Sequence, residues 1–98
     1  SPNDLELYLT RGEICEAMGD PEAARGDWDY VIRDVSVQMQ KTRDAKLLHL
    51  RGKAYRNLGE LDAAISDLEE AAKLDPTNAD FTSAYDAMRS HRDAAELQ

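Results

Sequence analysis

The sequence predicts an all-α protein made of two similar helical hairpins followed by a capping helix. Three observations lead to this fold class. The chain matches itself when it is shifted by 40 residues. Its apolar residues recur at spacings of three and four, which is the period of a helix with one buried face. Glycine and proline residues then divide each repeated unit at the points where helices are expected to end.

The internal match runs through a full unit without a gap. Self-similarity at a fixed period is the signature of a repeat architecture, so both units are expected to share one structure. Identical residues stand at matched positions that include Leu7 and Leu47, Arg11 and Arg51, Gly12 and Gly52, Gly19 and Gly59, Ala23 and Ala63, Ala24 and Ala64, and Asp27 and Asp67.

The first unit is predicted to hold two helices joined by a short turn. A helix over about Asp4–Met18 should end at Gly19, because glycine readily enters the left-handed conformation that follows many helices. Asp20 is well placed to cap the next helix, and Pro21 to begin it, since the missing N–H of proline has no partner to lose there. This second helix should continue towards Met39.

The second unit repeats the design. Apolar residues from Leu47 to Leu58 recur at helical spacing, and Gly59 should end this helix. A second apolar series runs from Leu61 to Leu74, where Asp75-Pro76 should end it.

The residues of the second unit resemble the tetratricopeptide repeat. The resemblance is carried by Leu48-x-x-Arg51-Gly52-x-x-Tyr55, Ala64-x-x-x-Leu68, Ala71 and Pro76. The first unit is similar through Tyr8-x-x-Arg11-Gly12-x-x-Cys15 and Ala24-x-x-x-Trp28. Both units carry Arg where the family usually has Leu before the glycine. The usual period is about 34 residues, so the spacing of 40 predicts about six extra residues, placed around Val37 to Arg43 as a longer helix and a polar turn.

The small residues of the motif have a physical role. Gly12 and Ala24, like Gly52 and Ala64, are expected to face each other across a hairpin, because small side chains allow two helices to approach closely. The larger motif residues are expected to fill the space between successive hairpins, namely Trp28, Tyr55, Leu68 and Leu74.

The last segment departs from the motif. Asn78 can cap a helix in which Phe81, Ala84, Tyr85 and Met88 form one apolar stripe. An offset of about 34 residues puts Asp86 where the family glycine belongs, so this helix is interpreted as a cap. The alternative is the first half of a third repeat.

The resemblance implies a single tetratricopeptide domain over residues 1–98. Repeat 1 is placed at about 5–40, repeat 2 at about 45–78 and the capping helix at about 79–96. Because the chain starts with Ser1-Pro2 and not with Met, we expect it to be a fragment of a larger protein.

Composition excludes several classes of function. The 98 residues carry 12 Lys and Arg against 20 Asp and Glu, for a net charge of −8, which argues against nucleic acid and anionic membranes as partners. No apolar run is long enough to span a membrane. A single cysteine fits a reducing compartment, so a cytoplasmic location is expected. The two histidines and one cysteine show no metal-site spacing, and no catalytic or cofactor motif is present.

The family resemblance implies a concave groove lined by the first helix of each repeat. By position, the groove candidates are Glu6, Leu9, Thr10, Glu13 and Glu16 from the first repeat, Lys46, His49, Leu50, Lys53, Arg56 and Asn57 from the second, and Ser83, Ala84, Ala87 and His91 from the last helix. At the offset of 40, Glu6 meets Lys46, Glu13 meets Lys53 and Glu16 meets Arg56. One interpretation is that these pairs are exposed salt bridges that fix repeat register. The other is that Lys46, His49, Lys53 and Arg56 form a basic strip that captures an acidic peptide or a terminal carboxylate.

Charge is distributed unevenly between the repeats. Residues 1–40 hold three bases and nine acids (−6), residues 41–78 hold seven of each (0), and residues 79–98 hold two bases and four acids (−2). The carboxylate clamp of co-chaperone repeats is largely missing, since Leu9, Glu13 and Leu50 stand at its positions. His49 is expected to be a solvated groove residue, and Cys15 a buried structural thiol.

The sequence therefore predicts a noncatalytic protein-interaction module, of the adaptor, scaffold or co-chaperone kind, that binds a partner peptide or helix in its groove. The alternative is a structural unit whose hairpins form a homo-oligomer or stack within a longer solenoid.

Overall fold

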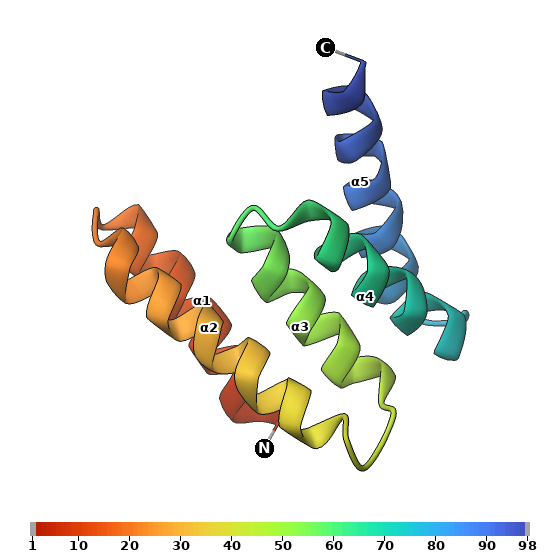
Figure 1. Ribbon diagram of the computed structural model, residues 1–98, viewed down its shortest axis with the longest axis horizontal. Helices are drawn as coiled ribbons and strands as arrows, with labels where there is room; N and C mark the ends of the chain where they lie inside the picture. The colour runs from red at the N-terminus through yellow and green to blue at the C-terminus, as the bar shows by residue number, and fades with distance from the viewer. Residues whose placement is uncertain (1, 98) are drawn as a thin grey trace.

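Five α-helices follow one another in the computed structural model, which describes residues 2–97 (Figure 1). They are α1 (Pro2–Ala17), α2 (Pro21–Gln38), α3 (Ala45–Asn57), α4 (Leu61–Leu74) and α5 (Ala79–Glu96). Residues 2–97 contain no strand, so the all-α prediction is confirmed. None of the helices in this range combines the length and the apolar character that crossing a membrane requires.

The helices form two antiparallel hairpins and a final helix packed on the second hairpin. Figure 1 shows the α1–α2 hairpin at one end of the molecule, α3 beside it, and α4 and α5 at the other end. The packed pairs are α1 with α2, α3 with α4, α2 and α1 with α3, and α4 with α5. The second hairpin is thus covered on both sides, by the first hairpin and by α5.

The turns inside both hairpins use the same backbone device. Gly19 and Gly59 adopt positive φ angles of 86° and 83°, the left-handed conformation that glycine adopts without strain. The N–H of Asp20 then donates to the carbonyl of Cys15 at 2.8 Å, and the N–H of Glu60 donates to Tyr55 at 2.9 Å. Each bond satisfies a carbonyl that the preceding helix leaves open.

Side-chain caps define the starts of three helices. The carboxylate of Asp20 accepts from the N–H of Ala23 at 3.2 Å, as predicted. Asp44 and Asn78 cap α3 and α5 in the same way, and accept from residues three positions later. Each cap satisfies one of the free N–H groups of a first helical turn.

The longer first repeat is explained by one helix and one connection. The α2 helix has 18 residues where α4 has 14, and the α2–α3 connection spans residues 39–44 where the α4–α5 connection spans 75–78. The two differences, of four and two residues, account for the six extra residues that the sequence predicted.

The core lies between the two hairpins and between α4 and α5. Residues of α1, α2 and α3 form the main apolar cluster, which includes Leu5, Leu9, Trp28, Val31, Val35, Leu47, Leu50 and Ala54. Two smaller clusters join α5 to the second hairpin, with Phe81 against Leu48 and Ala71, and Met88 against Ile65 and Leu68. The predicted apolar stripe of α5 is therefore confirmed.

Close packing at the motif glycines is confirmed, but one facing residue differs from the prediction. A Cβ atom on Gly12 would lie 2.4 Å from Nε1 of Trp28, so Trp28 and not Ala24 lies nearest this glycine. A Cβ atom on Gly52 would lie 2.8 Å from the Leu68 side chain and 3.3 Å from the carbonyl oxygen of Ala64. The glycine of each hairpin accommodates the large residue of the facing helix.

The predicted interior position of Leu74 is wrong. Its side chain is about half exposed in the last turn of α4. The reason is that α5 contacts α4 through Phe81 and Met88, whose partners Ile65, Leu68 and Ala71 all precede Leu74 in α4. Tyr55 is half-buried, with the guanidinium of Arg51 5.9 Å from the centre of its ring.

Candidate peptide-binding groove

A groove of about 360 Å³ runs along α3, between the first turns of α1 and α5. It exists because the first helix of each unit lies on the same side of the stack. We call it the α3 groove, and it is lined by Glu6, Lys46, His49, Lys53, Arg56, Asp80 and Ala84. Four of the residues predicted to bind a ligand, Lys46, His49, Lys53 and Arg56, are thus brought together.

The first predicted cross-helix pair is present. The Nζ of Lys46 lies 2.5 Å from Oε1 of Glu6, and both side chains are close to half exposed. The hydrogen bond and the positive charge of Lys46 lower the pKa of the Glu6 carboxyl. An ion pair with this much solvent contact adds little to stability, so it can open when a ligand arrives.

The other two predicted pairs are wrong. Glu13 accepts a hydrogen bond from Nδ2 of Asn57 at 3.2 Å and makes no ion pair with Lys53. Facing residues are 40 apart at Glu6 but 44 apart at Glu13, which is one helical turn more. The residues that face each other across the groove therefore do not keep the constant offset of 40 that the repeat match assumed.

Lys53 and Arg56 consequently keep their charges free. Among residues 2–97, neither side chain has a carboxylate partner, and Glu16 has no basic partner. These two cations face the α3 groove, with Asp80 of α5 across from them.

The prediction that His49 is solvated is wrong. Its side chain is only 7% exposed, its ring lies 4.8 Å from the ring of Phe81, and its Nδ1 is buried without a hydrogen-bond partner. Burial, together with the charges of Lys53 and Lys46, lowers the pKa of His49 to about 4. The imidazole is neutral at pH 7, and the positive charge of the groove comes from Lys46, Lys53 and Arg56.

Two positions that the repeat pattern assigned to the groove are in the core. Leu9 and Leu50 are buried between the hairpins, where they pack with Trp28 and Val31. They are on the apolar face of their helices and cannot contact a ligand. Cys15 is a free thiol that is partly buried against the same cluster.

Each hairpin also contains an ion pair that was not predicted, between an arginine of its first helix and a buried aspartate of its second helix. In the first, Arg11 donates to Asp27 from Nε at 2.8 Å and from Nη2 at 2.5 Å. In the second, Arg51 donates to Asp67 from the same two atoms at 2.7 and 2.8 Å. Both carboxylates are buried, and the bonds from Arg11 lower the pKa of Asp27.

The signal for these pairs was present in the 40-residue match. Arg11, Asp27, Arg51 and Asp67 are all conserved between the units, and both pairs are separated by 16 residues. A carboxylate that falls on the apolar face of a helix needs a partner. Arg11 and Arg51 are the one matched pair of identical basic residues in the two units, so this arginine is the natural partner for the repeated aspartate.

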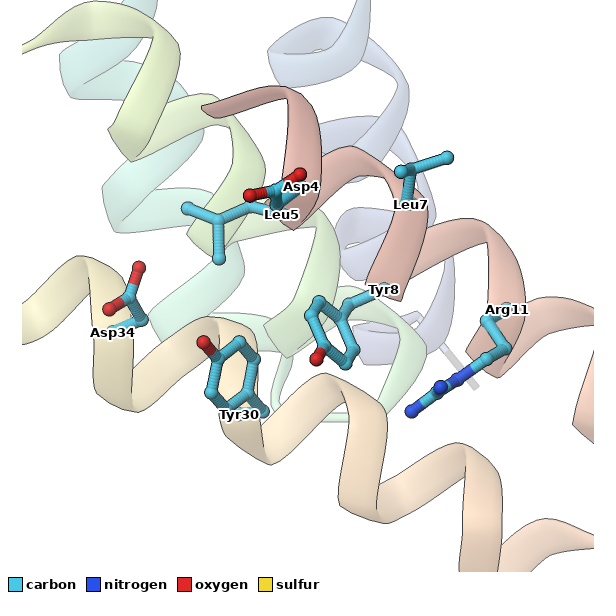
Figure 2. Close-up of a pocket in the computed structure, with 7 residues that line it drawn as sticks. All are labelled: Asp4, Leu5, Leu7, Tyr8, Arg11, Tyr30 and Asp34. Atoms are coloured by element: carbon cyan, nitrogen blue, oxygen red, sulfur yellow. The ribbon is translucent and has the colours of Figure 1, made fainter. Parts of the chain in front are cut away.

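A second hollow, of about 410 Å³, lies on the outer side of the first hairpin. Figure 2 shows Tyr8 of α1 and Tyr30 of α2 together in it, with Arg11 at one end and Asp34 at the other. The two rings lie 4.4 Å apart, and the guanidinium of Arg11 lies 4.9 Å from the centre of the Tyr8 ring. Tyr8 and Arg11 belong to the repeat motif, but no hollow was predicted at this place.

Comparison with known protein families finds a match for one segment of the chain. Residues 45–78 match the tetratricopeptide repeat family. These residues comprise α3, α4 and the connection to α5. Searches of curated proteins and of solved structures found no match. The second hairpin therefore resembles the tetratricopeptide repeat, a type of module that generally mediates noncatalytic protein–protein interaction, within an all-α chain of stacked helices.

Proposed function

We propose that the chain binds an acidic segment of another protein in the α3 groove. The observation that carries this proposal is the free pair of cations, Lys53 and Arg56, beside the exposed and exchangeable Lys46. Three positive charges on one helix face favour a ligand that carries carboxylates, either a C-terminal tail or an internal acidic stretch.

The walls of the groove define where such a ligand would lie. On the α1 side the groove is lined by Glu6, which repels carboxylates, while α3 carries the cations. A ligand carboxylate would therefore follow α3 and compete with Glu6 for Lys46. Ala84 and the neutral His49 leave an uncharged floor between the cations.

The global charge of −8 directs the choice of partner class. It disfavours polyanions such as nucleic acids, whose phosphates would meet the acidic first repeat. A short acidic peptide avoids most of that repulsion, because interactions between exposed charges are screened beyond about 8–10 Å at moderate ionic strength. The free thiol of Cys15 suits a reducing compartment, so we place this interaction in the cytoplasm.

The test is fluorescence anisotropy with a labelled acidic peptide, once with a free C-terminal carboxylate and once amidated. Lys53→Glu with Arg56→Glu is expected to weaken binding at least tenfold, because it reverses both free charges in the groove. Tighter binding of the free-acid peptide than of the amide would indicate recognition of a C-terminal tail.

A matched control separates the groove from net charge. Arg25 and Arg33 are exposed on α2, away from the α3 groove. Arg25→Glu with Arg33→Glu changes the total charge by the same amount and should leave affinity nearly unchanged. Equal loss in both double variants, or no binding of acidic peptides by the unaltered chain, would overturn the proposal.

A further inference from the structure

The outward face of α1 carries apolar side chains that nothing covers among residues 2–97. Leu7, Ile14 and Met18 are 68%, 53% and 80% exposed. Their spacing of seven and four residues puts them on one side of the helix or its end, and we call them the α1 stripe. Large exposed apolar side chains gathered on one face are typical of an interaction site.

The matched positions in the second repeat show what such a stripe does. Forty residues later stand Leu47, Ala54 and Leu58. Leu47 and Ala54 are fully buried and Leu58 is partly buried, all in the cluster that joins α3 to the first hairpin. In α3, therefore, these positions form the interface with the preceding hairpin.

The same interface recurs one step further along the stack. Phe81 and Met88 of α5 stand 34 residues after Leu47 and Ala54, and both are buried against the second hairpin. Two successive first helices thus use the same positions to contact the hairpin before them. The α1 stripe occupies the same positions in the first helix of the first hairpin, so it is the surface on which a preceding hairpin would pack.

Two further observations support the packing of another hairpin against α1, namely the charges of the first helices and the residues that precede the α1 stripe. The cations of α3 lie between Glu6 of α1 and Asp80 of α5, so acidic and basic first helices alternate. In addition, Pro2-Asn3-Asp4, in the first turn of α1, shares its proline with Pro76-Thr77-Asn78 at an offset of 74, the sum of 40 and 34. In the second repeat, this sequence connects a hairpin to the next first helix.

We infer that the α1 stripe and the Tyr8–Tyr30 hollow form a docking surface for a further helical hairpin of the same repeat type. That hairpin would present an apolar face like the one α5 covers, and a basic first helix that faces the acids of α1. The established interface between neighbouring hairpins would then be repeated once more. This inference does not depend on ligand binding in the α3 groove.

A second copy of this chain does not meet that description. The face of its first hairpin that could receive α1 is covered by α3, and the face of its second hairpin is covered by α5. Two copies that met through their α1 stripes would bring two acidic first repeats together.

The test uses the chain's own second hairpin as the probe. A copy of residues 45–78 is fused directly to Leu5, so that the added Asn78 precedes Leu5 as the original Asn78 precedes Ala79. The fusion is expected to unfold in one transition with a midpoint about 5 °C or more above that of the unfused chain, since stacked repeats stabilise their neighbours. Leu7→Glu with Met18→Glu in the fusion should abolish this gain.

The control is the same double substitution in the unfused chain, where both side chains are exposed and the midpoint should change by less than about 2 °C. A fusion with an unchanged midpoint, or with a gain that survives the double substitution, would overturn the inference. So would a stable dimer of the unfused chain in analytical ultracentrifugation that Leu7→Glu converts to monomer, because a second copy would then be the partner.

Discussion

The two hairpins share a sequence pattern but differ in what surrounds them. The second hairpin lies between the first hairpin and α5, whereas among the helices of residues 2–97 the first hairpin has a neighbour on one side alone. Leu47 is 3% exposed, and its counterpart Leu7 is 68% exposed. The repeat motif therefore determines the fold of each hairpin, while the burial of a given position depends on its place in the stack.

The same contrast extends to the repeated ion pairs. The side chain of Arg51 is 21% exposed and also donates to Ser36 of α2 at 3.1 Å, so it links the two hairpins. The side chain of Arg11 is 63% exposed at the open face. The same Arg–Asp ion pair is thus more exposed to water in the first repeat than in the second. Matched substitutions in the two repeats should therefore change the free energy of unfolding by different amounts.

The largest expected difference is between Leu47→Ala and Leu7→Ala. Leu47→Ala should lower the free energy of unfolding by about 3 kcal/mol, because it leaves a cavity between the hairpins. Leu7→Ala should change it by less than about 0.5 kcal/mol, since the side chain is already in water and Ala favours the helix. Urea denaturation followed by circular dichroism measures both. Equal losses would mean that the open face of α1 is covered in solution.

A smaller difference is expected between Asp67→Ala and Asp27→Ala. Removing Asp67 should cost about 2–3 kcal/mol, because the largely buried Arg51 loses two charge-assisted hydrogen bonds. Asp27→Ala should cost less, since the more exposed Arg11 can be hydrated. Denaturant titration of both variants at low and high salt checks this order. A larger loss for Asp27→Ala would contradict the role assigned to exposure.

The next effect depends on pH and compares His49 with its counterpart Leu9. The pKa of His49 is about 4 in the folded chain, against an ordinary value of about 6.5. Between these values the unfolded chain binds a proton that the folded chain does not, so stability falls as pH falls from about 6.5 to about 4. The loss should be about 2–3 kcal/mol at the acid end of this window.

His49→Leu gives the second repeat the residue of the first and should remove this loss. At pH 7 the variant should be at least as stable as the unaltered chain, because the unpartnered buried Nδ1 disappears. Thermal unfolding between pH 4 and pH 8 is the measurement. Parallel pH curves for the two proteins would show that His49 is not protected from protonation.

Local features were predictable because a few neighbouring residues determine them. The caps at Asp20 and Asn78, the glycine turns at Gly19 and Gly59, and the six extra residues of the first repeat depend on short-range sequence. The apolar stripe of α5 was also predictable, because its apolar residues recur at helical spacing. These features established the fold class before any tertiary contact was known.

The groove was harder to predict because its details depend on how helices cross. Glu13 pairs with Asn57 and not with Lys53, because the register between α1 and α3 shifts by one turn along the groove. The buried His49 lies against Phe81 of α5, and no pattern within α3 reveals that contact. The Arg11–Asp27 pair, in contrast, was indicated by the repeat match and needed only the idea that a buried carboxylate requires a cation.

The smallest effect tests whether the close packing inside a hairpin is independent of its place in the stack. Gly12→Ala places a Cβ atom 2.4 Å from Nε1 of Trp28, which must move and lose its hydrogen bond to the Leu9 carbonyl. The overpacking is partly offset by the better helix propensity of Ala, so a net loss of about 1 kcal/mol is expected. Gly26→Ala in α2 is the matched control, because nothing lies within 4 Å of its added Cβ, and it should stabilise the chain by about 0.5–1 kcal/mol. Trp28 fluorescence during urea unfolding reports on both. If Gly12→Ala were as stabilising as Gly26→Ala, the open first hairpin would be free to widen, and the difference between the two hairpins would extend from their outer faces to their interiors.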